Sequence, residues 1–401
     1  MRTLGQKASF WVVAPVAAIA LWTSAAPTVT YPLYASEWHL TPTATTAIFA
    51  VYPVVLVVVL VFFGNISDYI GRRAAILIGL LASLSGVVLF AVAPDVVWVL
   101  IGRGLMGVGV ALSLSPATAA AVEFSPVGQS KRASSITTAA TALGLASATL
   151  VGGALIQYAP LPTHLNFWVL ALVIAVVAVF AWFLPRRTRA EQQGRWRPRA
   201  LAIPRGVRKF FAISAVAVTG SFAVGAIMLS LGTQIAQTLI GSNNALVNGS
   251  VIALNAAAIG VTAIVARRLR PSSIVIFGGV FATAGMAVML FSSEQQSLPI
   301  FLVSAVLTGV GYSLLFSGGL TFIAVHAPIH HRAGMVSAAY LIAYLFQGSI
   351  ALFLGATATS SGLRVTLDVG AGIIAVFSIA ALVLAVTLGR ERPAALAPSG
   401  A

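Results

Sequence analysis

The stretch Gly64-Asn65-Ile66-Ser67-Asp68-Tyr69-Ile70-Gly71-Arg72-Arg73 decides the fold, because it is a short polar segment between two long apolar runs. These runs, Thr43 to Phe63 and Ala74 to Val92, are each about as long as the roughly 20 residues that a helix needs to cross a bilayer. The polar stretch is therefore predicted to be a loop at a membrane surface. Its two glycines permit backbone conformations closed to other residues, and its arginines favour the cytoplasmic side.

The composition of the 401-residue chain is typical of a polytopic membrane protein, with 59% hydrophobic residues, 8% charged residues and a mean hydropathy of +1.00. This composition excludes a soluble fold. A net charge of +15 would suggest nucleic-acid binding in a soluble chain, but here the basic residues follow membrane topology, so no nucleic-acid partner is expected. The chain has no cysteine, which excludes disulfides, thiol catalysis and cysteine metal sites.

Five residues of the polar stretch form the pattern G-x-x-x-D-x-x-G-R-R, namely Gly64, Asp68, Gly71, Arg72 and Arg73. The pattern resembles the signature loop of the major facilitator superfamily of secondary transporters. The alternative is that these are turn residues and topology-setting charges. The acid fixed between the glycines favours the transporter interpretation, because juxtamembrane acids are costly without partners. The resemblance implies an all-α fold with twelve transmembrane helices in two six-helix bundles and identifies the five residues as a gating motif.

Twelve apolar runs match that expectation. We interpret the first as a retained helix, because it is too long for a signal-peptide core. The runs cover residues 10–33, 43–63, 74–92, 96–119, 134–156, 165–184, 211–231, 246–266, 273–291, 298–325, 334–356 and 365–388. The predicted domains are an N-terminal six-helix bundle (1–184), a basic cytoplasmic linker (185–209), a C-terminal six-helix bundle (210–389) and a cytoplasmic tail (390–401).

Charge placement and an internal repeat support this topology. All 23 lysines and arginines except Arg103 and Arg364 fall in segments predicted to be inside, as the positive-inside rule requires. Residues 105–115 and 307–317 share identical residues at regular positions, which favours two parallel repeats. Both termini are therefore expected in the cytoplasm. The excess of arginine over lysine and the abundant alanine point to a bacterial inner membrane.

Arg103 is the basic residue predicted to lie within a membrane span. Burying a guanidinium at a helix centre costs about 2.5 to 3.5 kcal/mol on insertion scales, so it should face a wet cavity or an acceptor. The superfamily has an arginine at this place followed by spaced glycines, which Gly107 and Gly109 reproduce. The alternative is snorkelling to the nearby outer surface. We interpret Arg103 as a coupling residue.

Coupling also involves the inner surface, where Asp68 and Arg72 are expected to form an ion pair when the cytoplasmic side is shut. Glu123, at the inner end of the fourth helix, is predicted to extend that network as a second coupling residue. An exposed pair contributes only about 0 to 1 kcal/mol, so it would bias two conformers of similar energy without holding either alone.

The substrate cavity is predicted from polar and aromatic residues spaced along single faces of apolar helices. Aromatic rings with a few amides suit a bulky, mainly apolar ligand. The alternatives are helix packing through small residues, interhelical hydrogen bonds by the amides, and a kink beside Pro53. The candidate lining residues are Ser24, Thr28, Tyr31, Tyr52, Asn255, Tyr312, Phe316, Tyr340, Tyr344 and Gln347.

No cofactor and no metal site is expected. His326 and His330 have an i, i+4 spacing that can hold a metal, but no carboxylate or cysteine accompanies them, so we favour plain loop histidines. No Walker loop, G-x-S-x-G or H-E-x-x-H motif occurs, which argues against an ATP-driven pump or a membrane hydrolase. The expected partners are a small-molecule substrate and the lipid bilayer, with the protein acting as a monomer.

Residues and resemblance favour a secondary active transporter that exports hydrophobic or amphipathic compounds by proton antiport. Gly144, Gly152 and Gly153 partly resemble the glycine-rich stretch of the drug:proton antiporters, although the Gly-Pro pair of that group falls on Ala148-Thr149. The proton gradient is the driving force that the resemblance implies, but no acid lies deep in a predicted span, so uniport remains open. The alternatives are an importer or uniporter of a small organic solute and, from another class, a membrane-embedded enzyme or lipid scramblase.

Overall fold

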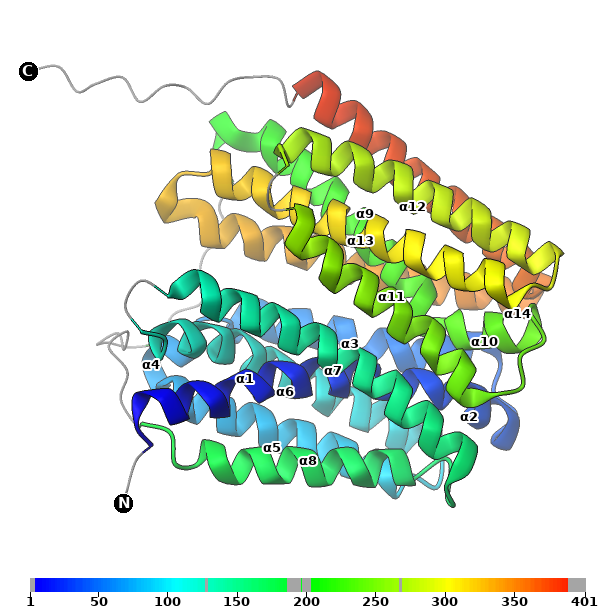
Figure 1. The fold of residues 1–401 in the computed structure, drawn as a ribbon, viewed down its shortest axis with the longest axis horizontal. Coiled ribbons are helices and arrows are strands. Elements are labelled where there is room, and N and C mark those ends of the chain that lie inside the picture. The colour runs from blue at the N-terminus through cyan, green and yellow to red at the C-terminus, as the bar shows by residue number, and fades with distance from the viewer. Residues whose placement is uncertain (1–3, 127–128, 186–195, 197–202, 267–268, 389–401) are drawn as a thin grey trace, which may run out of the picture.

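The computed structural model describes residues 4–126, 129–185, 196, 203–266 and 269–388 of the chain. Over these residues it is a bundle of helices in two lobes, which lie one above the other in Figure 1. The predicted cytoplasmic tail and most of the predicted linker lie outside the described residues.

The helices follow the two predicted halves of the chain in order. The first lobe holds α1 (Gln6–Ala25), η1 (Ala26–Val29), α2 (Tyr31–Glu37), α3 (Pro42–Phe63), α4 (Ser67–Ile70), α5 (Arg72–Ala91), α6 (Val96–Glu123), α7 (Ser130–Tyr158) and α8 (Leu165–Ala181). The second lobe holds η2 (Arg205–Val207), α9 (Arg208–Ser230), α10 (Gly232–Thr238), α11 (Ala245–Val265), α12 (Pro271–Glu294), α13 (Leu298–His326) and α14 (Ile329–Leu388).

The described residues contain twelve membrane crossings. Ten stretches of helix are long and apolar enough to span a bilayer. The last of these counts twice, because α14 leaves helical geometry at Gly362, where φ is +86°, and turns back. The remaining crossing is α8, an apolar helix of 17 residues, which is near the lower limit for a span. The predicted all-α fold with twelve transmembrane helices is therefore confirmed.

The first crossing differs from its prediction as a single regular helix. A 3-10 segment, η1, separates α1 from α2. Pro27 and Pro32 lie in this region and lack the backbone N–H that a continuous α-helix would use, so the helical hydrogen bonding changes here. Ser24, Thr28 and Tyr31 all belong to this crossing, but η1 lies between Ser24 and Tyr31, so the three residues do not follow one uninterrupted α-helix.

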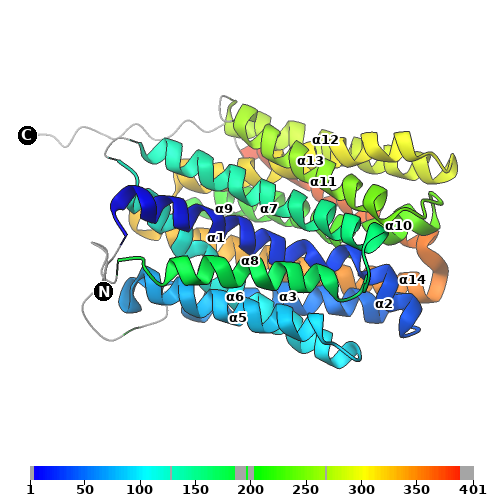
Figure 2. The same ribbon diagram turned by 60° about the horizontal axis from the view of Figure 1, so that its bottom comes forward.

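The two lobes meet through two antiparallel helix pairs, α3 with α14 and α7 with α11. Figure 2 shows α7 between α11 and α1. Glycines let these helices approach closely: Gly249 of α11 lies against the main-chain oxygen of Thr149 in α7, and Gly355 of α14 lies against Thr46 in α3. We call the two ends of the bundle the Asp68 end and the Thr43 end, after the residues that lie there.

Hydrogen bonds join the lobes at the Thr43 end. The Thr43 and Thr359 hydroxyls lie 2.8 Å apart, between α3 and α14. Thr233 of α10 donates its hydroxyl to the Thr28 carbonyl at 3.0 Å. The backbone N–H of Ala245, at the start of α11, donates to the side-chain oxygen of Gln157 in α7 at 2.8 Å. These bonds shut the bundle at this end.

Toward the Asp68 end the lobes separate. The first half of α11 is largely buried, but no residue from 257 to 265 is. In α3, likewise, burial ends at Val57, and residues 58–63 are half-buried or exposed. Both helices belong to the pairs that join the lobes at the other end. Gly260 of α11 still approaches Ala142 of α7, so the lobes separate beyond this contact. We describe the structure as closed at the Thr43 end and open at the Asp68 end.

Candidate functional site

The predicted gating motif lies where α3 passes through the short helix α4 into α5. Gly64 caps the end of α3, and its N–H donates to the Leu60 carbonyl at 2.9 Å. Gly71 has φ +87° and ψ 150°, a conformation that strongly favours glycine, and it turns the chain into α5. The turn places Arg72 as the first residue of α5, directly beside the acid of the motif.

Arg72 is the centre of a network of polar contacts in the first lobe. Its guanidinium lies 2.7 Å from the Asp68 carboxylate and 3.1 Å from the Glu123 carboxylate of α6, and it donates to the Ser67 hydroxyl at 2.5 Å. The side chains of Arg72, Asp68 and Glu123 are 12%, 19% and 25% exposed. This partial burial strengthens the attraction relative to a pair in bulk water.

The network differs in one respect from its prediction. The Asp68–Arg72 pair was expected when the Asp68 end is shut, yet it is formed while the lobes are apart there. The reason is that all its members belong to the first lobe, and Asp68 and Arg72 are only four residues apart. The pair therefore fixes the loop against α6, and its formation does not depend on the position of the second lobe.

An aromatic residue of the linker also contacts the gating loop. The Trp196 ring stacks on Phe63 with centroids 5.3 Å apart and planes at 10°, and its indole N–H donates to the Asn65 side chain at 3.1 Å. On the other side of the motif, the guanidinium of Arg73 lies 5.1 Å from the centroid of the Trp182 ring. Sequence reasoning did not identify the Trp196 contact, because nothing in the local sequence of the linker indicates where it docks.

Arg103 lies inside the first lobe and is completely buried, so it does not snorkel to the surface. Its guanidinium donates to two main-chain carbonyls, to Ile48 of α3 at 3.2 Å and to Ser24 of α1 at 3.0 Å. The Tyr52 ring covers one face of the guanidinium at 4.8 Å. Among the described residues, the remaining terminal nitrogen, Nη2, has no hydrogen-bond partner.

The candidate cavity residues of the first lobe fall into two groups. Tyr31 and Tyr52 lie near Arg103, and Tyr52 also lies beside the Ser24 side chain. The Tyr31 hydroxyl is buried without a hydrogen-bond partner in the described part of the chain. Thr28 instead belongs to the contact between the lobes at the Thr43 end, through its carbonyl. Ser24, Tyr31 and Tyr52 therefore gather around Arg103, whereas Thr28 does not.

The candidate aromatic residues of the second lobe surround a ring that the sequence analysis did not single out, Phe222 of α9. Its centroid lies 4.7 Å from Tyr344, 6.1 Å from Phe316, 6.3 Å from Tyr312 and 6.4 Å from Tyr340. We call these five rings the aromatic cage. Phe222 was missed because a phenylalanine in an apolar helix carries no sequence signal that separates a ligand contact from lipid-facing or core packing.

The cage faces the first lobe. Tyr52, whose ring lies over Arg103, is also near Tyr312 and Tyr344 of the cage. The Gln347 amide lies beside the cage, next to Gly225 of α9, which also contacts the Tyr312 ring. The structure thus brings one cation and five aromatic rings together at the junction of the two lobes.

Asn255 takes a different place from the other candidate lining residues. Its amide donates to the Ala305 carbonyl at 2.9 Å and to the Thr308 hydroxyl at 3.1 Å. Both acceptors belong to α13 of the same lobe. The geometry therefore matches the alternative interpretation of this residue as an interhelical hydrogen-bond donor.

The histidines at the Asp68 end show no metal-like grouping. His326 stacks on Phe210 with centroids 3.7 Å apart, and its Nδ1 lies 3.1 Å from the Phe322 carbonyl. The side chain of His330 lies outside the described residues. In the described parts of the chain no three histidine, cysteine, aspartate or glutamate side chains come together as metal ligands.

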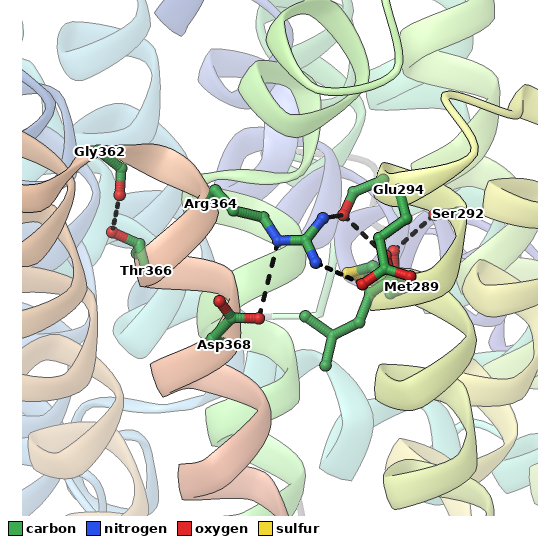
Figure 3. A network of polar contacts seen from close by, with 9 residues as sticks. Met289, Ser292, Glu294, Gly362, Arg364, Thr366 and Asp368 are labelled. Carbon is green, nitrogen blue, oxygen red and sulfur yellow. Dashed lines mark hydrogen bonds and ion pairs between the residues drawn. The ribbon is translucent and has the colours of Figure 1, made fainter.

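A second arginine network lies in the second lobe, at the Thr43 end (Figure 3). Arg364 lies 2.7 Å from the Glu294 carboxylate of α12 and 3.8 Å from that of Asp368, and it donates to the Ser293 hydroxyl at 2.8 Å. It follows Gly362, the residue at which α14 turns back. The network ties the last crossing of the chain to α12.

Comparisons with known proteins agree with this architecture. A bacterial homologue of the human lysosomal transporter Spinster, solved in an inward-facing and unoccupied conformation, aligns with TM-score 0.74 and 14% identity over 97% of this chain and 99% of its own. A POT family transporter in complex with 5-aminolevulinic acid gives 0.78 and 13% over 96% of both chains. A mutant of the nucleoside transporter NupG gives 0.78 and 12% over 95% of this chain and 100% of its own.

These structural likenesses show the fold alone. A comparison with curated protein sequences gives no match. The sequence model of the Major Facilitator Superfamily, however, matches residues 11–293, from the first crossing to the end of α12. This match covers well over half of the 401 residues. The chain belongs to the Major Facilitator Superfamily.

Proposed function

We propose that the protein exports hydrophobic or amphipathic compounds across the bacterial inner membrane by alternating access. The observation that carries the proposal is the aromatic cage around Phe222 at the junction of the two lobes. Aromatic rings offer large apolar contact area with few conformational degrees of freedom, which suits ligands that share bulk rather than a fixed hydrogen-bond pattern. Membership of a transporter family favours transport over the enzyme and scramblase alternatives.

The proposed transport cycle uses the closed Thr43 end and the open Asp68 end as one of its two arrangements. The basic residues around the Asp68 end favour the cytoplasmic side for it, because positive charge accumulates in cytoplasmic loops. In this orientation the structure is open to the cytoplasm, where an exporter collects its substrate. Rocking of the lobes would then break the bonds at the Thr43 end and release the substrate outside.

As the driving force we propose the proton gradient. Asp68 and Glu123 are carboxylates that share one arginine at the open end, so taking up a proton on either would weaken the network that fixes the gating loop. A second candidate function is uniport. It is favoured by the position of the acids, since every Asp and Glu of the described residues lies at or near a helix end rather than deep in a crossing.

The test is transport of a fluorescent hydrophobic dye in cells with and without the protein. An exporter lowers dye accumulation, and a proton uncoupler restores it to the level of cells that lack the protein. A uniporter speeds equilibration in both directions and does not respond to uncoupler beyond the empty control. Raised accumulation with the protein present would contradict export and support import.

Tyr344→Leu provides the matched variant for this experiment. It removes the ring nearest to Phe222 while keeping an apolar side chain of similar reach. Since one aromatic contact contributes about 0.5 to 1.5 kcal/mol beyond area burial, the apparent affinity for the dye should fall about threefold to tenfold. Unchanged affinity, with normal insertion of the variant, would remove the cage from the binding site.

A further inference from the structure

We propose that Arg103 binds the carboxylate of a substrate whose apolar body lies in the aromatic cage. The inference rests on the proposed function and adds to it the charge of the substrate. It follows from a buried cation with one terminal nitrogen that is unpaired in the described structure, and from the position of Tyr52 near both that cation and the cage.

The site carries the positive charge of Arg103. Arg103 is fully buried, and both of its hydrogen bonds go to neutral main-chain oxygens, those of Ser24 and Ile48. All other charged side chains in the described crossings lie at or near helix ends. A charge in the membrane interior without a counter-charge is costly. An anion brought to this site would therefore be strongly stabilised.

In the described structure the site also has two unpaired hydrogen-bond donors. Nη2 of Arg103 and the hydroxyl of Tyr31 are both buried, and within the described structure neither has a hydrogen-bond partner. The two residues lie near one another. A carboxylate has two oxygens that accept from a guanidinium N–H and a phenol O–H at once. A neutral acceptor would satisfy the geometry but would leave the charge uncompensated.

Tyr52 connects the cage with Arg103. Tyr52 covers the guanidinium on one face, with its ring centroid 4.8 Å away, and lies near Tyr312 and Tyr344 of the cage. One molecule with an acid at one end and an apolar body at the other therefore bridges the two lobes.

The charge of Arg103 determines which ligands the site should prefer. An aromatic cage alone would also accept an organic cation, because cations are attracted to ring faces. The fixed positive charge of Arg103 opposes this, since like charges repel strongly in a medium of low dielectric constant. The site should therefore prefer an amphipathic acid to a neutral molecule of the same shape, and a neutral molecule to an amine.

The experiment compares three probes that share one apolar body: 1-pyrenebutyrate, 1-pyrenebutanol and 1-pyrenebutylamine. Their binding to the purified full-length protein, in nanodiscs of neutral lipid, is measured by pyrene fluorescence. The wild type should bind the acid about tenfold more tightly than the alcohol, since hydrogen bonds to charged groups are the stronger ones. The amine should bind most weakly.

Two variants locate the preference. Arg103→Gln should weaken binding of the acid about tenfold and leave the alcohol within about twofold, so that the preference disappears. Tyr344→Leu should weaken all three probes by a similar factor and keep their order, because it alters the cage and not the cation. Equal weakening of acid and alcohol by Arg103→Gln would overturn the proposal.

The comparison of probes in the wild type tests the proposal even if Arg103→Gln does not fold. Equal affinity of the wild type for acid and alcohol overturns it. Chloride is the second arm: if chloride raises the unfolding temperature of the wild type and the acid has no advantage, the site takes a free anion and the substrate carboxylate is excluded. Absence of export of all three probes from cells would contradict the proposed function, while the order of their affinities would still decide this inference.

Discussion

The two arginine networks of the molecule have the same construction and different surroundings. Each arginine contacts an acid four residues away on its own segment, an acid on a neighbouring helix and a serine hydroxyl. Each also follows closely on a glycine with positive φ, Gly71 at +87° and Gly362 at +86°. Arg72 lies at the open end, in the first lobe, whereas Arg364 lies at the closed end, in the second.

The difference between the networks is solvent exposure. The side chain of Arg72 is 12% exposed and that of Arg364 is 40% exposed, and the acids differ in the same direction. Water and salt weaken ion pairs between exposed groups, which contribute only about 0 to 1 kcal/mol. Identical chemistry is therefore expected to matter for the conformational cycle in the first lobe and hardly at all in the second.

The largest expected effect comes from Asp68→Asn. The change removes the closest carboxylate from a partly buried arginine and leaves Glu123 as its one charged partner, so the gating loop loses its fixed position. We expect the transport rate per inserted molecule to fall by about tenfold or more. The measurement is dye export in cells, normalised to the amount of protein in the membrane.

Asp368→Asn is the matched control for that measurement. Asp368 is also four residues from its arginine, but it lies 3.8 Å away and is 52% exposed. Its transport rate should stay within about twofold of the wild type. Equal losses in the two variants would show that burial does not distinguish the networks.

Alanine at the two glycines should give effects that are equal rather than different. Gly71→Ala and Gly362→Ala each place a side chain at positive φ with ψ of 150° and 163°, a conformation essentially restricted to glycine, at a cost of about 1 to 3 kcal/mol. Both should lower the thermal unfolding temperature in detergent by similar amounts. A large drop for one glycine alone would mean that the two turns are not equivalent.

A smaller effect is expected at Trp196, which has no counterpart in the second network among the residues that the structure describes. Trp196→Ala removes the stack on Phe63 and the hydrogen bond to Asn65. An aromatic pair contributes about 0.5 to 1.5 kcal/mol, so protease cleavage in the linker should accelerate about threefold to tenfold. Trp196→Phe keeps the stack and should recover most of the protection. Unchanged cleavage in the alanine variant would contradict docking of the linker.

The smallest effect is expected for Arg364→Gln. All its ionic partners are about half exposed, so the loss of stability should be about 0 to 1 kcal/mol and should vanish at high salt. Thermal unfolding at low and high ionic strength measures it. A loss that persists at high salt would show that this network carries more than surface electrostatics.

The fold was largely predictable because its determinants are local and repeated. Apolar runs long enough to span a bilayer, separated by charged turns, require helices, since backbone polar groups inside a membrane must be satisfied internally. The difference in the first crossing has an equally local cause. Pro27 and Pro32 lack the backbone N–H of a continuous α-helix, and the structure has the 3-10 segment η1 there. The sequence contained that signal.

The candidate site was less predictable because its residues are joined by contacts between distant segments. The types of residue at Tyr312, Tyr340 and Tyr344 indicated an aromatic cavity, but Phe222 at its centre is indistinguishable from any apolar helix residue in the sequence. Asn255 carried two interpretations, and only the positions of its acceptors on α13 separate them. Residue type therefore indicates chemistry, whereas the partner of each side chain comes from the packing of helices.

The glycines at the contact between the lobes, at the Thr43 end, are positions where a substitution should change the conformational equilibrium. A methyl group added at Gly249 would collide with the Thr149 carbonyl, and one at Gly355 would collide with Thr46, as long as this end is shut. Such a methyl group penalises the arrangement that is shut at this end, so we expect the population to shift toward the other arrangement. A single carbon atom, placed where the lobes touch, should thus be enough to choose the direction in which the resting molecule faces.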